Sequence, residues 1–197
     1  MAPILINREP SVTATDDYTA LLIIDVQEGL DEPRLGARNN PAAESNMARL
    51  LAEWRARNRP IYHVQHMSTE PDSPLRPELP GNAIKREVAP NDDEPVIQKT
   101  VNAAFIGTDL RERLRAACIE SLVIIGLTTD HCVSSTARMA GDLGFRVIVV
   151  ADATAAHERL SYDGAQHSAE TVHELALANL HQEFATILTT DQVLGLH

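Results

Sequence analysis

A short, unbroken apolar run near the N-terminus most constrains the fold of this chain. Residues 20–26 read ALLIIDV, so apart from Asp25 both alternating sets of side chains are apolar. A strand with this pattern is buried on both faces, which is typical of a parallel sheet covered by helices. Residues 121–127 and 145–150 carry further strong strand patterns, SLVIIGL and FRVIVV. These runs predict a buried, parallel sheet.

Segments with helical spacing alternate with the predicted strands. Strands are expected at residues 20–26, 61–65, 96–99, 121–127, 145–150 and 185–188, and helices at 41–58, 108–117, 130–143 and 168–182. This alternation predicts an α/β fold, a three-layer αβα sandwich with a mainly parallel, roughly six-stranded Rossmann-like sheet. No internal repeat or linker divides the chain. We therefore expect a single domain over residues 1–197, in which residues 1–17 form an N-terminal arm.

Composition and charge argue against several classes of function. The formal net charge is −11 and the Lys and Arg residues are scattered, which argues against nucleic acid as a partner. The longest apolar runs are too short to cross a bilayer, so no membrane partner is expected. The N-terminus lacks the pattern of a secretory signal, so we expect a cytoplasmic protein. In that reducing compartment the two cysteines, Cys118 and Cys132, would be free thiols.

Two segments stand apart from the alternation of strands and helices. Residues 67–95 contain six of the eleven prolines, surrounded by polar residues. An ordered loop of this length is often a lid or a binding loop, and an oligomer contact is an equal alternative. The second segment covers residues 152–168. Its part at 162–167 either closes over a pocket or forms a plain surface loop.

Three reactive side chains lie at or just after the carboxyl ends of predicted strands, where ligands bind in open α/β sheets. Asp25 ends the first strand, Lys99 ends the third, and Cys132 follows the strand 121–127. Each also has an ordinary structural explanation. Asp25 could be a helix cap or turn residue, Lys99 a solvated strand end, and Cys132 a buried small side chain.

Cys132 gives the strongest local signal of the three. It lies in VIIGLTTDHCV, in the predicted first turn of a helix that follows a buried strand. The first turn of a helix has unpaired amides and partial positive charge, which favour a thiolate and can stabilise an oxyanion. Cys118, by contrast, falls late in an amphipathic helix and is expected to be an inert core residue.

Three separated motifs resemble those of the isochorismatase-like cysteine hydrolases. That superfamily includes nicotinamidases and N-carbamoylsarcosine amidohydrolase. The segment GLTTDHCV, residues 126–133, resembles its nucleophile turn. Asp25 in LLIIDVQ and Lys99 in QKTVNAAFIGTDL match the other members of its Asp–Lys–Cys triad. The motifs occur in the family's order, and the resemblance covers roughly residues 18–194.

The resemblance implies a role for each member of the triad. Cys132 would be the nucleophile, Asp25 would exchange protons with the thiol and the leaving group, and Lys99 would hold both and stabilise negative charge. The oxyanion would bind the backbone amides of Thr128 and Cys132, after a cis peptide bond between Leu127 and Thr128. Five residues would lie near the pocket and contact the substrate: Gln27, Asn102, Phe105, Thr129 and His131.

The sequence departs from the nicotinamidase pattern at the metal site. Nicotinamidases hold a metal ion with an Asp and several His after the second strand. Here that region offers only His63 and His66, without an Asp-x-His group. Residues three apart on a strand point to opposite faces, so these two side chains cannot easily share an ion. We therefore predict no metal and no cofactor.

Together these features predict a metal-independent cysteine hydrolase. It would cleave a C–N bond of a small amide, cyclic amide or ureide through a thioester intermediate. The alternatives are a vinyl-ether hydrolase of the isochorismatase type, a nicotinamidase, and a non-catalytic binding protein on the same fold. The expected partner is a small-molecule amide substrate. The resemblance also implies a homo-oligomer, either a dimer or a tetramer.

Overall fold

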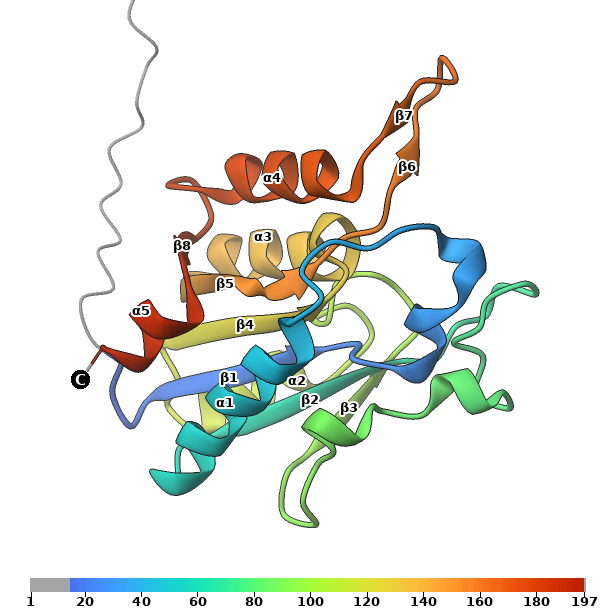
Figure 1. Cartoon of the computed structure of the whole chain (residues 1–197). Coiled ribbons are helices and arrows are strands. Elements are labelled where there is room, and N and C mark those ends of the chain that lie inside the picture. The colour runs from blue at the N-terminus through green and yellow to red at the C-terminus, as the bar shows by residue number, and fades with distance from the viewer. Residues whose placement is uncertain (1–14, 197) are drawn as a thin grey trace, which may run out of the picture.

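The computed structural model describes residues 15–196 (Figure 1). Most of the predicted N-terminal arm, residues 1–14, lies outside the described residues. The strands are β1 (Thr19–Ile24), β2 (Ile61–His66), β3 (Val96–Lys99), β4 (Ser121–Leu127), β5 (Arg146–Ala155), β6 (Arg159–Leu160), β7 (Gln166–His167) and β8 (Thr186–Leu188). The α-helices are α1 (Ala43–Ala56), α2 (Leu110–Ala116), α3 (Ser134–Asp142), α4 (Ala169–Leu180) and α5 (Thr190–Leu194).

Six strands form one central sheet in the order β3-β2-β1-β4-β5-β8. Every neighbouring pair in this sheet is parallel. The predicted α/β fold with a parallel, six-stranded sheet is therefore confirmed. The chain runs from β1 outward to β3 and then returns to the other side of β1 with β4, so the strand order reverses between β1 and β4. At such a point, the helices that follow the two strands lie on opposite faces and leave a crevice at the carboxyl ends.

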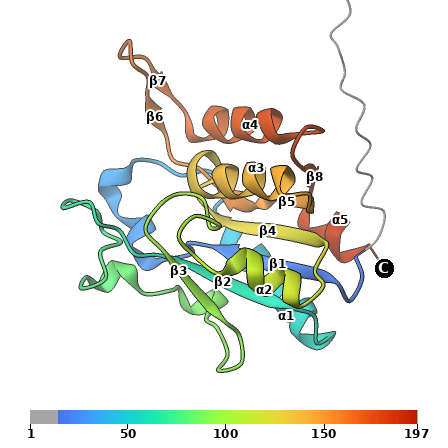
Figure 2. The ribbon, with the colours of Figure 1, turned by 180° about the vertical axis from the view of Figure 1, so that it is seen from behind.

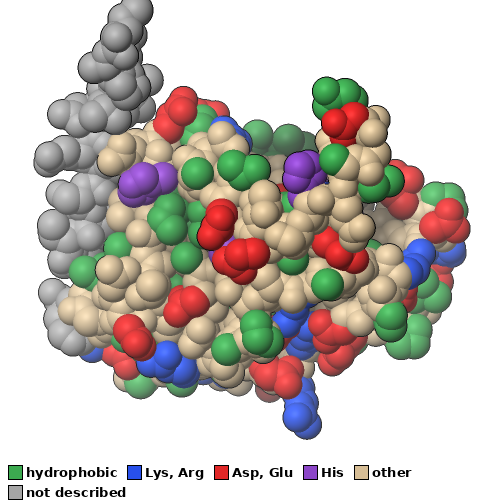
Figure 3. Space-filling model, turned by 45° about the horizontal axis from the view of Figure 1, so that its top comes forward, with side chains coloured by type: hydrophobic (Ala, Val, Ile, Leu, Met, Phe, Trp, Pro, Cys, Tyr) green, Lys and Arg blue, Asp and Glu red, His purple; other side chains and the backbone are tan. Residues whose placement is uncertain are grey.

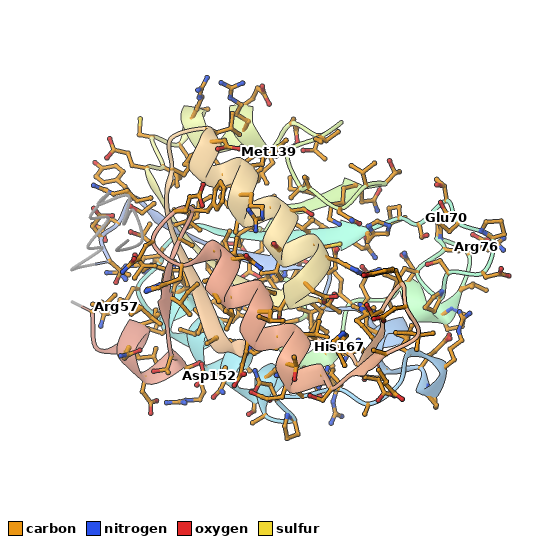
Figure 4. All side chains as sticks on the ribbon, turned by 90° about the horizontal axis from the view of Figure 1, so that it is seen from above. Arg57, Glu70, Arg76, Met139, Asp152 and His167 are labelled. Atoms are coloured by element: carbon orange, nitrogen blue, oxygen red, sulfur yellow. The ribbon has the colours of Figure 1, made fainter. Side chains whose placement is uncertain are left out.

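Helices cover both faces of the sheet and give the three layers. The even-numbered side chains of β1, including Leu22 and Ile24, pack in one core with α2, α3 and α4. The odd-numbered side chains Leu21 and Ile23 pack in a second core with α1 and α5. Figure 2 shows α2 and α3 in front of the sheet, and Figure 4 shows α3 and α4 side by side above it. The two-sided apolar pattern of residues 20–24 is explained by these two cores.

The second core holds the one tryptophan of the chain. Trp54 lies on α1, is 1% exposed, and donates a hydrogen bond from Nε1 to the carbonyl of Thr19 at 3.0 Å. Thr19 begins β1, so this contact lies at the amino end of the sheet, opposite the crevice.

Several elements differ from the sequence-based prediction. The helix predicted at 130–143 begins as a π-helix, Thr129–Val133, and continues as α3. β5 extends five residues beyond the predicted end at 150, because its pairing with β4 shifts register between Ile124 and Gly126. Cys118 is exposed, not a core residue, because it follows the end of α2 in a left-handed turn with φ +57°.

The two long loops both reach the carboxyl edge of the sheet. Residues 67–95 contain the 3-10 helices Pro80–Asn82 and Arg86–Val88. Glu70 and Arg76, labelled in Figure 4, mark the outer part of this loop. The strands β6 and β7 form an antiparallel hairpin that projects from the body. Its tip carries the fully exposed side chain of Tyr162, and hydrophobic side chains are visible there in Figure 3. In this structure the tip is thus a surface turn that does not close over the crevice.

Among the described residues, no helix has both the length and the apolar character that crossing a membrane requires.

Candidate active site

Asp25 is the first residue after β1 and lies at the bottom of the crevice. Its backbone turns sharply there, with φ +48°, a conformation that Asp tolerates better than most residues. The turn is held by a hydrogen bond from the Asp25 amide to the carbonyl of Val64 at 2.9 Å. The side chain is 1% exposed. A carboxylate buried this deeply needs a cation or hydrogen-bond donors nearby.

Lys99 supplies that cation. It ends β3, and its side chain is fully buried. Its Nζ lies 2.6 Å from Oδ2 of Asp25 and 3.4 Å from Sγ of Cys132. The ammonium group also donates to the carbonyl of Val101 at 3.1 Å and contacts Nδ1 of His66 at 3.0 Å. The ammonium group thus joins the carboxylate to the thiol.

Cys132 reaches the same point from β4. Gly126 allows β4 to approach β1 closely, because its φ is +125° and a Cβ there would lie 2.1 Å from the carbonyl oxygen of Ile24. The π-helix that follows brings Cys132 over the carboxyl end of β1. Sγ also lies 3.7 Å from Oδ1 of Asn102. The structure therefore brings Asp25, Lys99 and Cys132 together, from three strands that are far apart in the sequence.

Burial controls the protonation of this cluster. Burial raises the pKa of Asp25, although the charge and hydrogen bond of Lys99 oppose the shift. Burial and then the negative charge of Asp25 raise the pKa of the Cys132 thiol far above its ordinary value. This differs from the expectation that a helix start favours the thiolate. A raised thiol pKa means that Cys132 needs a base to take its proton at the moment of attack.

Two members of the cluster, Asp25 and Cys132, line a cavity of about 250 Å³. Two predicted substrate-binding residues, Asn102 and His131, line it as expected. The cavity is lined by polar and apolar side chains from several segments: Asp25, Leu30, Leu35, His66, Ser73, Leu75, Asn102, Leu127, Thr128, His131, Cys132, His157 and Arg159. A cavity of this size fits a small molecule.

The other three predicted substrate-binding residues lie behind the wall. Gln27 is fully buried, and its amide group bonds to the backbone of His66 at 2.8 and 3.1 Å. Thr129 is also fully buried and shares a 2.8 Å hydrogen bond with Nδ1 of His173. Phe105 stacks on Phe145 with ring centroids 6.0 Å apart. Their positions favour a supporting role, because each side chain is already occupied by a protein partner.

The predicted oxyanion site borders the cavity. Thr128 and Cys132 both line it, and the Leu127–Thr128 peptide bond is cis, as the resemblance implied. The carbonyl of Thr128 is turned inward, where it accepts hydrogen bonds from the amides of His131 and Val133 at 3.2 Å. That the amides of Thr128 and Cys132 bind an oxyanion stays a prediction.

Sequence reasoning missed Arg159 and His157 as cavity residues. Arg159 begins β6 and donates from Nε to Asp130 at 2.9 Å. His157 is 3% exposed, with its Nε2 3.2 Å from the carbonyl of Leu30. Both come from a loop without a recognisable pattern. His66 offered a usable signal, because it ends β2 at the same edge as Asp25 and Lys99.

The donor atoms of Asp25, His66 and Cys132 lie within 4.8 Å of one another, as they would around a metal ion. The ammonium of Lys99 contacts all three residues, so these donors already surround a cation. His63 points elsewhere, as predicted: it is 1% exposed and its Nε2 lies 2.9 Å from Glu94. The nicotinamidase type of metal site therefore does not fit these residues.

Fold and site together define an α/β protein with a buried Asp–Lys–Cys cluster at the strand-order reversal of a parallel sheet. The family model described as the isochorismatase domain matches residues 19–192. The isochorismatase family protein YrdC of Bacillus subtilis (strain 168) is 46% identical over 180 residues, covering 91% of this chain and 96% of that protein. Nicotinamidase 3 of Arabidopsis thaliana is 26% identical, covering 95% and 90%.

A solved structure agrees with these sequence comparisons. A hydrolase of the isochorismatase family from Chromobacterium violaceum ATCC 12472 superimposes with a TM-score of 0.89 at 42% identity. The match covers 92% of this chain and 94% of that one. The chain belongs to the isochorismatase family of hydrolases.

Proposed function

We propose that this hydrolase is a metal-independent cysteine amidase that cleaves a C–N bond of a small amide, cyclic amide or ureide. The observation that carries the proposal is the contact of Lys99 Nζ with Asp25 Oδ2 at 2.6 Å and with Cys132 Sγ at 3.4 Å, where Asp25 and Cys132 line a small cavity. A thiol can serve as the nucleophile of covalent acyl transfer, and the adjacent carboxylate can serve as its base.

In the first half of the reaction, Sγ of Cys132 attacks the carbonyl carbon while its proton passes to Asp25. The carbonyl oxygen becomes an oxyanion, which the amides of Thr128 and Cys132 would stabilise. The C–N bond then breaks, the departing nitrogen takes the proton from Asp25, and a thioester remains on Cys132. The raised pKa of Asp25 suits this role, since the group must both accept and release a proton.

In the second half, a water molecule attacks the thioester carbonyl while Asp25 accepts its proton. The C–S bond breaks, the thiolate regains the proton, and the acid product leaves. The ammonium group of Lys99, in contact with both Asp25 and Cys132, offsets the negative charge that moves between the carboxylate and the sulfur. One base therefore serves both halves.

The relatives support the reaction class without fixing the substrate. Nicotinamidase 3 is named for the hydrolysis of an amide. A nicotinamidase activity is the weaker candidate here, because His63 is paired with Glu94 and the remaining histidine faces Lys99. Vinyl-ether cleavage of the isochorismatase type would use no covalent bond to Cys132. A binding protein without turnover would use neither reaction.

The test is a panel of small amides, cyclic amides and ureides, with release of ammonia or amine as the readout. We expect Cys132→Ala to lower the rate at least about a thousandfold, because the nucleophile is lost. Cys118→Ala is the matched control and should keep the full rate, since Cys118 is exposed after α2, outside the site. Dialysis against a chelator should change nothing.

Rapid acid quenching and intact mass measurement separate the candidates. The amidase forms an adduct of the acyl mass on Cys132. Turnover of a vinyl ether added to the panel, without an adduct and retained in Cys132→Ala, would support the non-covalent vinyl-ether reaction. Amide turnover retained in Cys132→Ala would contradict the nucleophile. No turnover of any compound would favour the binding protein.

A further inference from the structure

His66 ends β2 and stands directly beside Lys99 in the sheet, where the two residues are paired in register. Its Nδ1 lies 3.0 Å from Nζ of Lys99, and the side chain lines the cavity. One of its ring nitrogens lies within 4.8 Å of both the Cys132 sulfur and the Asp25 carboxylate. The proposed reaction steps use Asp25, Lys99 and Cys132 but not His66.

Buried amides hold the backbone of His66 on both sides. Gln27 accepts from the His66 amide at 2.8 Å and donates to its carbonyl at 3.1 Å. Asn82 donates to the same carbonyl at 2.9 Å. Gln27 and Asn82 are 0% and 6% exposed, and buried amide groups are costly unless they are hydrogen-bonded. The fold thus uses two buried side chains to fix one residue of the cavity wall.

The contact with Lys99 determines which ring nitrogen carries the proton. An ammonium group can only donate, so Nδ1 of His66 must accept. The ring proton of the neutral imidazole is then on Nε2. Burial, followed by the charge of Lys99, lowers the pKa of His66 to about 4, so the ring stays neutral at physiological pH. A neutral ring offers one acceptor and one donor in fixed directions.

We propose that His66 has two tasks in this site. As a positioning residue it accepts a hydrogen bond at Nδ1 and holds the Lys99 ammonium between Asp25 and Cys132. Through Nε2–H it also donates to an acceptor atom of the substrate next to the scissile carbonyl. The second task rests on the proposed amidase function, whereas the first task does not. The preferred substrates are therefore amides with a second carbonyl or a ring nitrogen close to the bond that breaks.

Two conservative variants separate the tasks. In His66→Asn, the amide oxygen can take the place of Nδ1 and accept from Lys99, but the donor at Nε2 is lost. In His66→Gln, the amide nitrogen can take the place of Nε2, but the acceptor near Lys99 is lost. His66→Phe removes both groups. His181→Asn is the matched control, because His181 is an exposed residue at the end of α4, away from the cavity.

The first task is measured without any substrate, by the rate at which iodoacetamide alkylates Cys132, with Cys118 in the same molecule as the internal reference. We expect His66→Gln and His66→Phe to slow this reaction at least about threefold, because the ammonium loses its fixed place beside the sulfur. His66→Asn and His181→Asn should alkylate at the wild-type rate. Unchanged alkylation in His66→Gln and His66→Phe would overturn the positioning task.

The second task is measured with an amide that the wild type hydrolyses. We expect His66→Asn to lose about tenfold to a hundredfold in kcat/KM, the effect of one lost hydrogen bond. The loss should vanish for a substrate analogue without the second acceptor. An equal loss with both compounds would overturn the donor task.

The outcomes also distinguish this inference from the proposed function. If the wild type hydrolyses no amide, the amidase proposal and the donor task fail together, and alkylation still decides the positioning task. If His66→Phe does not fold, His66→Asn and His66→Gln carry the comparison.

Discussion

The ammonium group of Lys99 explains how a carboxylate can be buried at the bottom of the crevice. Its side chain is fully buried against Asp25, which is 1% exposed, at 2.6 Å. Ion pairs in this setting add little net stability, but loss of one partner leaves the other charge without compensation. The residues around Asp25 therefore depend on Lys99 for stability as well as for chemistry.

We predict that Lys99→Met lowers the free energy of unfolding by about 3–5 kcal/mol. The double variant Asp25→Asn, Lys99→Met should regain part of this loss, because Asn carries no charge and tolerates the φ of +48°. Urea unfolding measures both. Arg86→Met is the control, since its side chain is 92% exposed and surface changes cost little. A Lys99→Met protein as stable as the control would show that the pair is not needed for folding.

At the residue scale, sequence reasoning located side chains that follow strands and missed those placed by contacts between loops. Asp25, Lys99 and Cys132 lie at or just after the ends of predicted strands, so topology alone brings them to one edge of the sheet. The family resemblance implied that Gln27, two residues after Asp25, lies near the pocket. Its side chain instead turns to His66, thirty-nine positions away, and no local pattern encodes that contact.

The strands were predictable from the sequence because they are uniformly buried. The π-helix that carries Cys132 was not. β1 and β4 are buried at every position, which their apolar sequences indicate directly. The π-helix Thr129–Val133 and the register shift beside Gly126 depend on how β4, β5 and β1 meet. These are long-range packing effects, and a helix start was the nearest local interpretation.

Gly126 offers a test at this scale. A left-handed backbone alone costs a non-glycine residue about 1–2 kcal/mol. We predict that Gly126→Ala lowers the free energy of unfolding by more than this, because the added Cβ would overlap the backbone of Ile24. Gly144→Ala is the matched control, since it has φ +91° with no atom within 4 Å of the added Cβ. Thermal or urea unfolding of the two variants gives the comparison. Equal costs would mean that β4 can move away from β1.

On the scale of the whole molecule, a charged network links the segments that build the cavity walls. Glu44 at the start of α1 accepts from Arg38 and from Lys85, the latter at 2.7 Å. Lys85 is 4% exposed and also contacts Asp31 at 2.6 Å. The network therefore connects the segment carrying Leu30 and Leu35 with the proline-rich loop, and both border the cavity.

This network predicts a loss of stability in acid. Burial raises the pKa of Glu44, but the hydrogen bonds from Arg38 and Lys85 outweigh it and lower the pKa from 4.5 to about 2. A lowered carboxyl pKa stabilises the fold above the unfolded value and loses that contribution as the pH falls from 4.5 toward 2. After allowance for solvent screening, the contribution is roughly 2 kcal/mol.

We therefore expect Glu44→Gln to have a lower free energy of unfolding in urea than the wild type at neutral pH. The difference between the two proteins should narrow as the pH falls from 4.5 toward 2. Glu174→Gln on the exposed face of α4 should show no gap at either pH. A difference between wild type and Glu44→Gln that stayed constant with pH would assign the loss to packing and not to charge.

The lone tryptophan gives the molecule a built-in optical reporter. Trp54 is sealed against the start of β1, about 20 Å from the end of the strand where Asp25 follows. Its fluorescence should shift to the red when the sheet separates from α1, and stay constant when a ligand occupies the cavity. The emission spectrum alone can therefore divide inactive variants into those that have lost the fold and those that have lost only catalysis.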